Sequence, residues 1–131
     1  VWESASSDDG AGNDIDIRAA RSTNNGITWS ETGWVNDYNA EDGEDDGSPV
    51  IATDGFGAWI CLWTTAAQAA GAGPDEDVVY ALSYDNGATW TEARLADEAA
   101  AGPEDRPIDG APSVAADRAG NWAAVWTKAD I

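Results

Sequence analysis

The sequence predicts an all-β fold: part of a β-propeller built from four-stranded antiparallel blades, with about two blade-equivalents in the chain. Three observations lead to this prediction. An octet with the chemistry of a tight turn occurs twice, the sequence around it repeats with a period of 61 to 63 residues, and its strand-like runs are apolar on both faces. A period of that length with four short strands is typical of a propeller blade.

The repeated octet is suited to closing a strand-to-strand turn. Residues 22–29 read Ser-Thr-Asn-Asn-Gly-Ile-Thr-Trp, and residues 83–90 read Ser-Tyr-Asp-Asn-Gly-Ala-Thr-Trp. The Ser and the Asn or Asp can accept hydrogen bonds from loop N–H groups, and Gly supplies a positive φ. Thr then returns the chain to an extended conformation, and Trp covers the hairpin with apolar surface. We expect the octet to lock a hairpin and to perform no reaction.

The repeat extends beyond the octet. Trp2 and Trp63 are 61 residues apart, as are the two octets, and residues 46–54 recur as 109–117 at an offset of 63. Four strands per repeat are then expected at 49–53, 57–64, 77–83 and 89–95, with partial copies at 15–22, 28–35, 112–116 and 121–127. The chain is predicted to be one partial propeller over 1–131: the outer strands of a first blade (1–36), a complete blade (48–97) and the inner strands of a third blade (109–128).

The run at 58–63 shows that each blade needs a neighbour on both sides. Alternation places Trp59, Cys61 and Trp63 on one face and leaves an apolar face opposite. A sheet that is apolar on both faces is covered on both faces. Cys61 is expected to be a buried apolar residue, and six tryptophans are assigned to the core: Trp29, Trp59, Trp63, Trp90, Trp122 and Trp126. Trp34 aligns with Leu95 and is the candidate for ligand binding.

The octet resembles the Asp-box, or BNR repeat, of sialidases and many other secreted proteins. All five signature positions are filled in the second copy by Ser83, Asp85, Gly87, Thr89 and Trp90, and the first copy has Ser22, Gly26, Thr28 and Trp29, with Asn24 replacing the aspartate. The resemblance implies a turn between the third and fourth strands of a blade, a ring of six blades, and a secreted or cell-surface location. No catalytic residue of sialidases is carried over. Arg106, in a poor echo of the family's Arg-Ile-Pro element, is kept only as a candidate ligand-binding residue.

Charge narrows the range of partners. With 6 basic and 25 acidic residues, the net charge is −19. Such a chain repels phosphate backbones and anionic lipid surfaces, so no nucleic-acid partner is expected. No run of 18 apolar residues occurs, so no membrane span is expected.

The acidic residues concentrate in the loops near 3–16, 37–46, 75–77 and 97–109, which strand alternation places on one face. Two interpretations stay open: binding of a hard cation such as Ca²⁺, which prefers carboxylate and carbonyl oxygens, or a solvated acidic surface. The candidate metal ligands are the aspartates that recur between copies: Asp14, Asp16, Asp46, Asp75, Asp77 and Asp109. No other cofactor is indicated.

The sequence thus predicts a secreted, non-catalytic module for binding or structural assembly, with a glycan as one candidate ligand. The alternative is a non-catalytic segment of a sialidase-type glycoside hydrolase. Two blade-equivalents cannot close a ring and would leave apolar faces and strand edges open. Closure is therefore expected from other copies of the chain or from the rest of a longer propeller chain.

Overall fold

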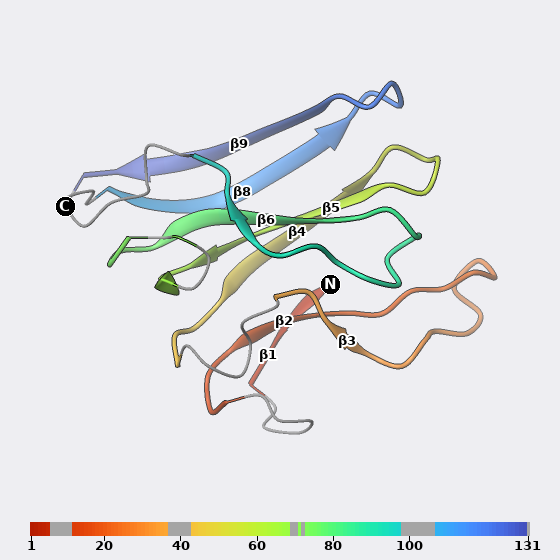
Figure 1. Ribbon diagram of the computed structural model, residues 1–131, viewed down its shortest axis with the longest axis horizontal. Helices are drawn as coiled ribbons and strands as arrows, with labels where there is room; N and C mark the ends of the chain where they lie inside the picture. Colours follow the sequence, from red (N-terminus) through yellow and green to blue (C-terminus); the bar gives the residue numbers. More distant parts are fainter. Residues whose placement is uncertain (6–11, 37–42, 69–70, 72, 98–106, 131) are drawn as a thin grey trace.

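The computed structural model describes residues 1–5, 12–36, 43–68, 71, 73–97 and 107–130 (Figure 1). Within these ranges the elements are strands in three antiparallel sheets, which confirms the all-β prediction. The first sheet has the order β1 (Trp2–Ser4), β2 (Asp16–Ala19), β3 (Gly33–Trp34). The second sheet is β4 (Gly47–Thr53), β5 (Trp59–Thr65), β6 (Asp77–Ser83), β7 (Arg94–Leu95). The third sheet is β8 (Ile108–Ala116) and β9 (Trp122–Ala129).

The three sheets are stacked in chain order, as blades are in a propeller (Figure 1). We call the face of a sheet that looks toward earlier residues its preceding face, and the opposite face its following face. In β5, Cys61 and Trp63 lie on the preceding face and pack against Ile17 of the first sheet. Leu62 lies on the following face and packs toward Trp126 of the third sheet. The predicted alternation of β5 is therefore confirmed.

Burial follows this stacking. Trp63 and Cys61 are fully buried and Leu62 is 1% exposed, because the second sheet has a neighbour on each side. Burial also raises the pKa of the Cys61 thiol to about 12. On the following face of β9, Val125 occupies the position of Leu62 but is 67% exposed, since none of the described sheets covers it.

One prediction about the core is wrong. Trp29 was assigned to the core but is 64% exposed, whereas its counterpart Trp90 packs against the core between the first and second sheets. The difference follows from position in the stack. Trp90 meets the first sheet, whereas none of the sheets in the described ranges lies on the preceding face of the first sheet, where Trp29 would need one.

The fourth strands are much shorter than predicted, with two residues each in β3 and β7. A side-chain hydroxyl interrupts the ladder at the same place in both repeats. The N–H of Arg21 donates to Ser30 Oγ at 3.1 Å, and the N–H of Leu82 donates to Thr91 Oγ1 at 3.0 Å. In a regular ladder these N–H groups would donate to backbone carbonyls. Because the hydroxyls accept them instead, regular strand pairing begins again only at β3 and β7.

The first sheet contains one strand that was not predicted. β1 pairs with β2 in the register Trp2 to Arg18, which matches the pairing of Trp63 with Val79 in the second sheet. β1 is therefore the counterpart of the end of β5. Counterparts of β4 and of the beginning of β5 are absent from the described part of the first sheet.

The turns between the first two strands of a blade are also equivalent. Asp54 Oδ1 accepts the N–H groups of Phe56 and Ala58, and Asp117 Oδ1 accepts those of Ala119 and Asn121. Gly55 has φ +78° in one turn, and Arg118 has φ +62° at the same position of the other. A non-glycine residue in this left-handed region is strained.

Candidate functional site

The two Asp-box turns share two hydrogen bonds from backbone N–H groups to side-chain oxygens. In the first, Ser22 Oγ accepts the N–H of Gly26 at 2.8 Å, and Asn24 Oδ1 accepts the N–H of Thr28 at 2.9 Å. In the second, Ser83 Oγ accepts the N–H of Gly87 at 2.8 Å, and Asp85 Oδ1 accepts the N–H of Thr89 at 2.9 Å. Each side-chain acceptor satisfies an N–H inside its own loop.

Two successive left-handed residues turn the chain in each box. They are Asn25 and Gly26 in the first, with φ of +58° and +81°, and Asn86 and Gly87 in the second, with φ of +60° and +78°. Consecutive positive φ values are typical of the tightest hairpin turns and favour Asn-Gly. The signature Ser, Asn or Asp, and Thr side chains bond within their own loop, as expected of a turn that holds structure.

The acidic loops bring the recurring aspartates to the opposite ends of the strands. Asp14, Asp16, Asp46, Asp77 and Asp109 are buried, and Asp75 is half-buried. The loops join neighbouring sheets in the same way twice: the N–H of Asp46 donates to the carbonyl of Ile15, and the N–H of Asp109 to that of Glu76. These contacts fix the start of each sheet against the preceding one.

Several of these carboxylates have structural partners. Asp109 Oδ2 accepts the indole N–H of Trp126 at 3.1 Å, and Lys128 lies 3.7 Å from Asp109 Oδ1 and 3.4 Å from Asp97. Asp77 Oδ2 accepts the N–H of Gly73 at 2.8 Å. Asp109 and Asp77 therefore brace the third sheet and the loop before β6.

Asp16 is fully enclosed. Its Oδ1 accepts a hydrogen bond from Asn36 Nδ2 at 2.7 Å, while its Oδ2 has no hydrogen-bond partner among the described residues. Desolvation by burial raises the pKa of Asp16, with a further rise from the charge of Asp14, against the lowering by Asn36 and Arg18. Asp14 is 8% exposed, and in the described ranges neither of its carboxylate oxygens has a hydrogen-bond partner.

The six aspartates do not form one cage. Among the residues that the structure describes, no three or more His, Cys, Asp and Glu side chains stand in an arrangement that could hold a metal ion. Arg106, the second candidate for ligand binding, lies outside the described residues.

Trp34 belongs to a row of side chains across the first sheet. Arg18 pairs with Trp2 on one side and with Trp34 on the other, and its guanidinium carbon is 3.7 Å from the centroid of the Trp34 ring. The same row in the second sheet is Trp63, Val79 and Leu95, which lies in the apolar core. A cation stacked on tryptophan thus replaces two aliphatic residues on the preceding face of the first sheet.

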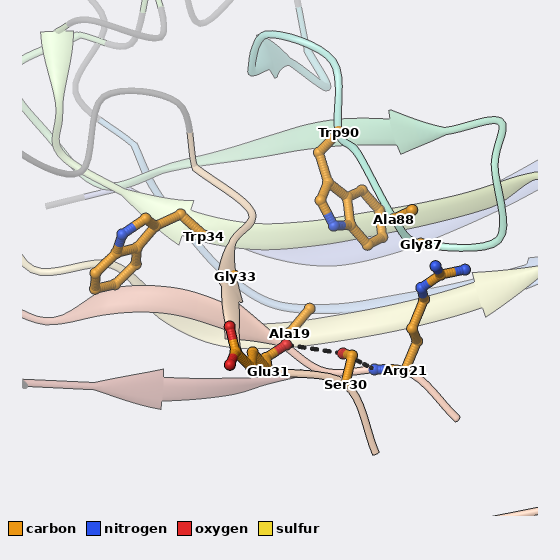
Figure 2. Close-up of a pocket in the computed structure, with 9 residues that line it drawn as sticks. All are labelled: Ala19, Arg21, Ser30, Glu31, Gly33, Trp34, Gly87, Ala88 and Trp90. Carbon is orange, nitrogen blue, oxygen red and sulfur yellow. Dashed lines mark hydrogen bonds between the residues drawn. The ribbon is translucent and has the colours of Figure 1, made fainter. Parts of the chain in front are cut away.

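Three cavities lie between the first and second sheets. One of about 340 Å³ at the Asp-box end is lined by Arg21, Glu31, Trp34 and Trp90 among others, and Figure 2 shows Arg21 and the Trp90 ring on its two sides. A neighbouring cavity of about 680 Å³ is more apolar, with Val1, Ile51, Trp29, Trp59 and Trp90 in its lining. A third, of about 600 Å³, lies at the acidic end and is lined by Asn13, Asp14, Gly43, Glu44, Asp45, Ala66 and Glu76.

Sequence reasoning did not identify Arg18, Arg21 or Asn36 as parts of these sites. For the two arginines a signal exists, because Arg18 aligns with Val79 and Arg21 with Leu82 in the repeat. A charged residue at a position that is apolar in the other copy marks a local change of role. Asn36 aligns with Asp97, and its contact with Asp16 spans 20 residues, which no local pattern indicates.

Comparisons with known proteins agree with this architecture. A family model described as a BNR repeat-like domain matches residues 1–125. A solved structure, the Hadza microbial sialidase Hz136, matches with a TM-score of 0.52 and 23% sequence identity, over 62% of this chain and 19% of that chain. The likeness at this identity concerns the fold, and the chain spans about a fifth of the length of that sialidase. No curated protein matches the chain.

Proposed function

Because the chain belongs to the BNR repeat-like domain family, we propose that it is a non-catalytic propeller module for structural assembly and binding. Its partners are other copies of itself or the remaining blades of a longer chain. The observation that carries this proposal is the contrast between Leu62, 1% exposed, and Val125, 67% exposed, at equivalent positions of neighbouring sheets. The following face of the third sheet has the residues of a blade interface and lacks the next blade.

The preceding side of the stack supports the same proposal. Trp2 is 40% exposed where its counterpart Trp63 is fully buried. The 680 Å³ cavity is lined by Val1, Ile51 and Trp59, beside the place where counterparts of β4 and the beginning of β5 would complete the first sheet. β8 and the beginning of β9 correspond to these two segments, whereas the end of β9 corresponds to β1, which the first sheet already has. A hairpin from a neighbouring unit whose second strand ends where β1 begins would match the cavity in both chemistry and strand order.

The test is the mass of the native protein and of two matched variants. We expect assemblies for the wild type in sedimentation or native mass spectrometry, and dissociation for Val125→Asp. Phe56→Asp is the control, because Phe56 is 79% exposed but lies in the turn before β5 and not on a blade face. A monomer for the wild type would contradict self-assembly and would leave completion by a longer chain as the remaining version. In that case Val125→Asp and Phe56→Asp are compared in the longer chain, and a loss of stability in Val125→Asp alone would show that Val125 contacts its remaining blades.

A glycan is the ligand class that we propose for the 340 Å³ cavity. Its lining combines the aromatic ring of Trp90 with the hydrogen-bonding groups of Arg21, Ser30 and Glu31 (Figure 2). An aromatic face with a few polar groups around it matches a sugar ring, which has one apolar face and a rim of hydroxyls. Oligosaccharide titration followed by tryptophan fluorescence tests this. Arg21→Leu should weaken binding without unfolding the chain, because Leu82 is the natural residue at that position of the next repeat.

The alternative is that the chain is a non-catalytic segment of a sialidase-type glycoside hydrolase, which the structural likeness to a sialidase favours. An assay with a fluorogenic sialoside, carried out on this chain and on the product of the full-length gene, separates the two views. Turnover by the full-length product but not by this chain would favour the alternative, and turnover by this chain alone would overturn the non-catalytic proposal. We also propose a secreted or cell-surface location, which detection of the protein in the medium or on intact cells would test. Among the described residues there is no helix with the length and apolar character needed to cross a bilayer.

A further inference from the structure

The acidic cavity between the first and second sheets gathers negative charge around one buried carboxylate, that of Asp14. Four carboxylates line its 600 Å³, from Asp14, Glu44, Asp45 and Glu76, and the lining contains neither lysine nor arginine. Glu44, Asp45 and Glu76 are exposed, so water stabilises their charge. Asp14 is more than nine-tenths buried, so water stabilises its charge much less.

Within the part of the chain that the structure describes, Asp14 has no compensating bond: both of its carboxylate oxygens are enclosed, and neither has a hydrogen-bond partner there. Its position is constrained as well, because a Cβ on Gly12 would overlap Asp14 Oδ1. The backbone of Gly12 therefore lets the carboxylate lie where a larger residue would exclude it. A buried carboxylate in this state calls for a positive partner.

Asp16 adds a second buried carboxylate that needs a positive partner. It begins β2 two residues after Asp14, which lies just before the strand, and the two carboxylates are close enough for the charge of Asp14 to act on Asp16. Asp16 is 1% exposed, and its Oδ2 has no hydrogen-bond partner in the part of the chain that the structure describes. Two neighbouring carboxylates with three oxygens that lack hydrogen bonds attract a divalent cation more strongly than a single charge can.

We propose that Asp14 and Asp16 bind a Ca²⁺ ion at this rim, with water in the remaining coordination positions and with Glu44, Asp45 and Glu76 attracting the ion through their charge. Ca²⁺ fits because it accepts irregular sets of six to eight oxygens that include water. Since the described carboxylates do not form a ready-made cage of three, affinity should be modest, with a Kd on the order of 0.1 to 1 mM, as in weak extracellular calcium modules. This inference is independent of the assembly and glycan proposals.

The experiment measures the melting temperature of the full chain in chelator and across a CaCl₂ titration, with NaCl at matched ionic strength. We expect a saturable rise of several degrees for the wild type with Ca²⁺ and none with NaCl. Asp14→Asn should melt at the same or a higher temperature than the wild type in chelator, because the neutral amide removes a buried charge, and its Ca²⁺-dependent rise should be lost. Glu92→Gln, which removes one exposed charge from outside the cavity, should keep the full rise.

A binding isotherm measured by calorimetry provides the second readout. The proposal is overturned if Ca²⁺ and ionic-strength-matched NaCl raise the melting temperature equally, or if Asp14→Asn retains the saturable rise. Either result would mean that the carboxylates of the acidic cavity are a solvated acidic surface and do not bind Ca²⁺. Neither would affect the mass of the assembly, so failure of this site and failure of the proposed function are distinguished.

Discussion

Asn24 and Asp85 occupy the same position in the two Asp-boxes and bond to the threonine four residues later with donor and acceptor exchanged. Asn24 donates through Nδ2 to Thr28 Oγ1 at 2.8 Å, whereas Asp85 accepts through Oδ2 from Thr89 Oγ1 at 2.7 Å. A hydroxyl can act in either sense, so the network survives the substitution. The departure of the first copy from the family signature is therefore neutral in geometry and removes a titrating group.

The second box should consequently be sensitive to acid while the first is not. Hydrogen bonds from the Thr89 side chain, then from its N–H, and then from Ser83 lower the pKa of Asp85 from 3.8 to about 2. A lowered carboxylate pKa gives stability that is fully present above the unfolded-state value and is lost as pH falls through the folded-state value. We expect Asp85→Asn to reduce the drop in melting temperature between about pH 4 and pH 2.

The Asp85→Asn variant should retain part of the acid sensitivity of the wild type. Asp117 also has a lowered pKa, caused first by the Asn121 side chain and then by loop N–H groups. Identical pH profiles for the wild type and Asp85→Asn would show that the carboxylate contributes nothing beyond what an amide supplies.

Arg118 offers a stabilising substitution. It holds φ +62° where the other copy of the turn has Gly55, and an L-residue in this region costs about 1 kcal/mol. Arg118→Gly should raise the free energy of unfolding by up to about 1 kcal/mol in a denaturant titration. Gly55→Ala is the reciprocal control and should lower it by about the same amount, because the added Cβ would meet nothing closer than Arg118 Nε at 3.9 Å and only the backbone is strained.

Equivalent positions on neighbouring sheets should respond differently to truncation. Leu62→Ala should cost about 2 to 5 kcal/mol of unfolding free energy, since the side chain is 1% exposed. Val125→Ala should stay within about 0.5 kcal/mol in a separated chain, because the side chain is 67% exposed. A larger cost for Val125→Ala under conditions in which the protein assembles would report burial of that face by a neighbour.

The contact between Trp126 and Asp109 can be measured with a pair of conservative changes. Trp126→Phe removes the indole N–H that Asp109 Oδ2 accepts at 3.1 Å, and should cost about 1 to 3 kcal/mol because Asp109 is 1% exposed. Trp122→Phe makes the same chemical change on the same face of β9, and should cost less because its indole forms no hydrogen bond with the described residues. Equal losses in thermal or chemical unfolding would attribute the effect to ring size alone.

The sequence was most informative where the repeat made two copies comparable. The range of β6 and the alternation of β5 were predicted closely because strongly apolar residues at period two fix them. The fourth strands were overestimated because the hydroxyls of Ser30 and Thr91 replace carbonyl acceptors, which propensity does not show. For the acidic sites, sequence located the recurring aspartates. Their partners, such as Asn36 for Asp16 and Trp126 for Asp109, depend on pairing between distant strands.

Cys61 gives the protein an internal reporter. Its thiol is sealed between the first two sheets and is the single sulfur atom of the chain. A thiol-reactive dye can reach it only when those sheets separate, so the labelling rate counts opening events at that one interface and no other. Modification kinetics could thus follow how tightly consecutive blades adhere, without any engineered label.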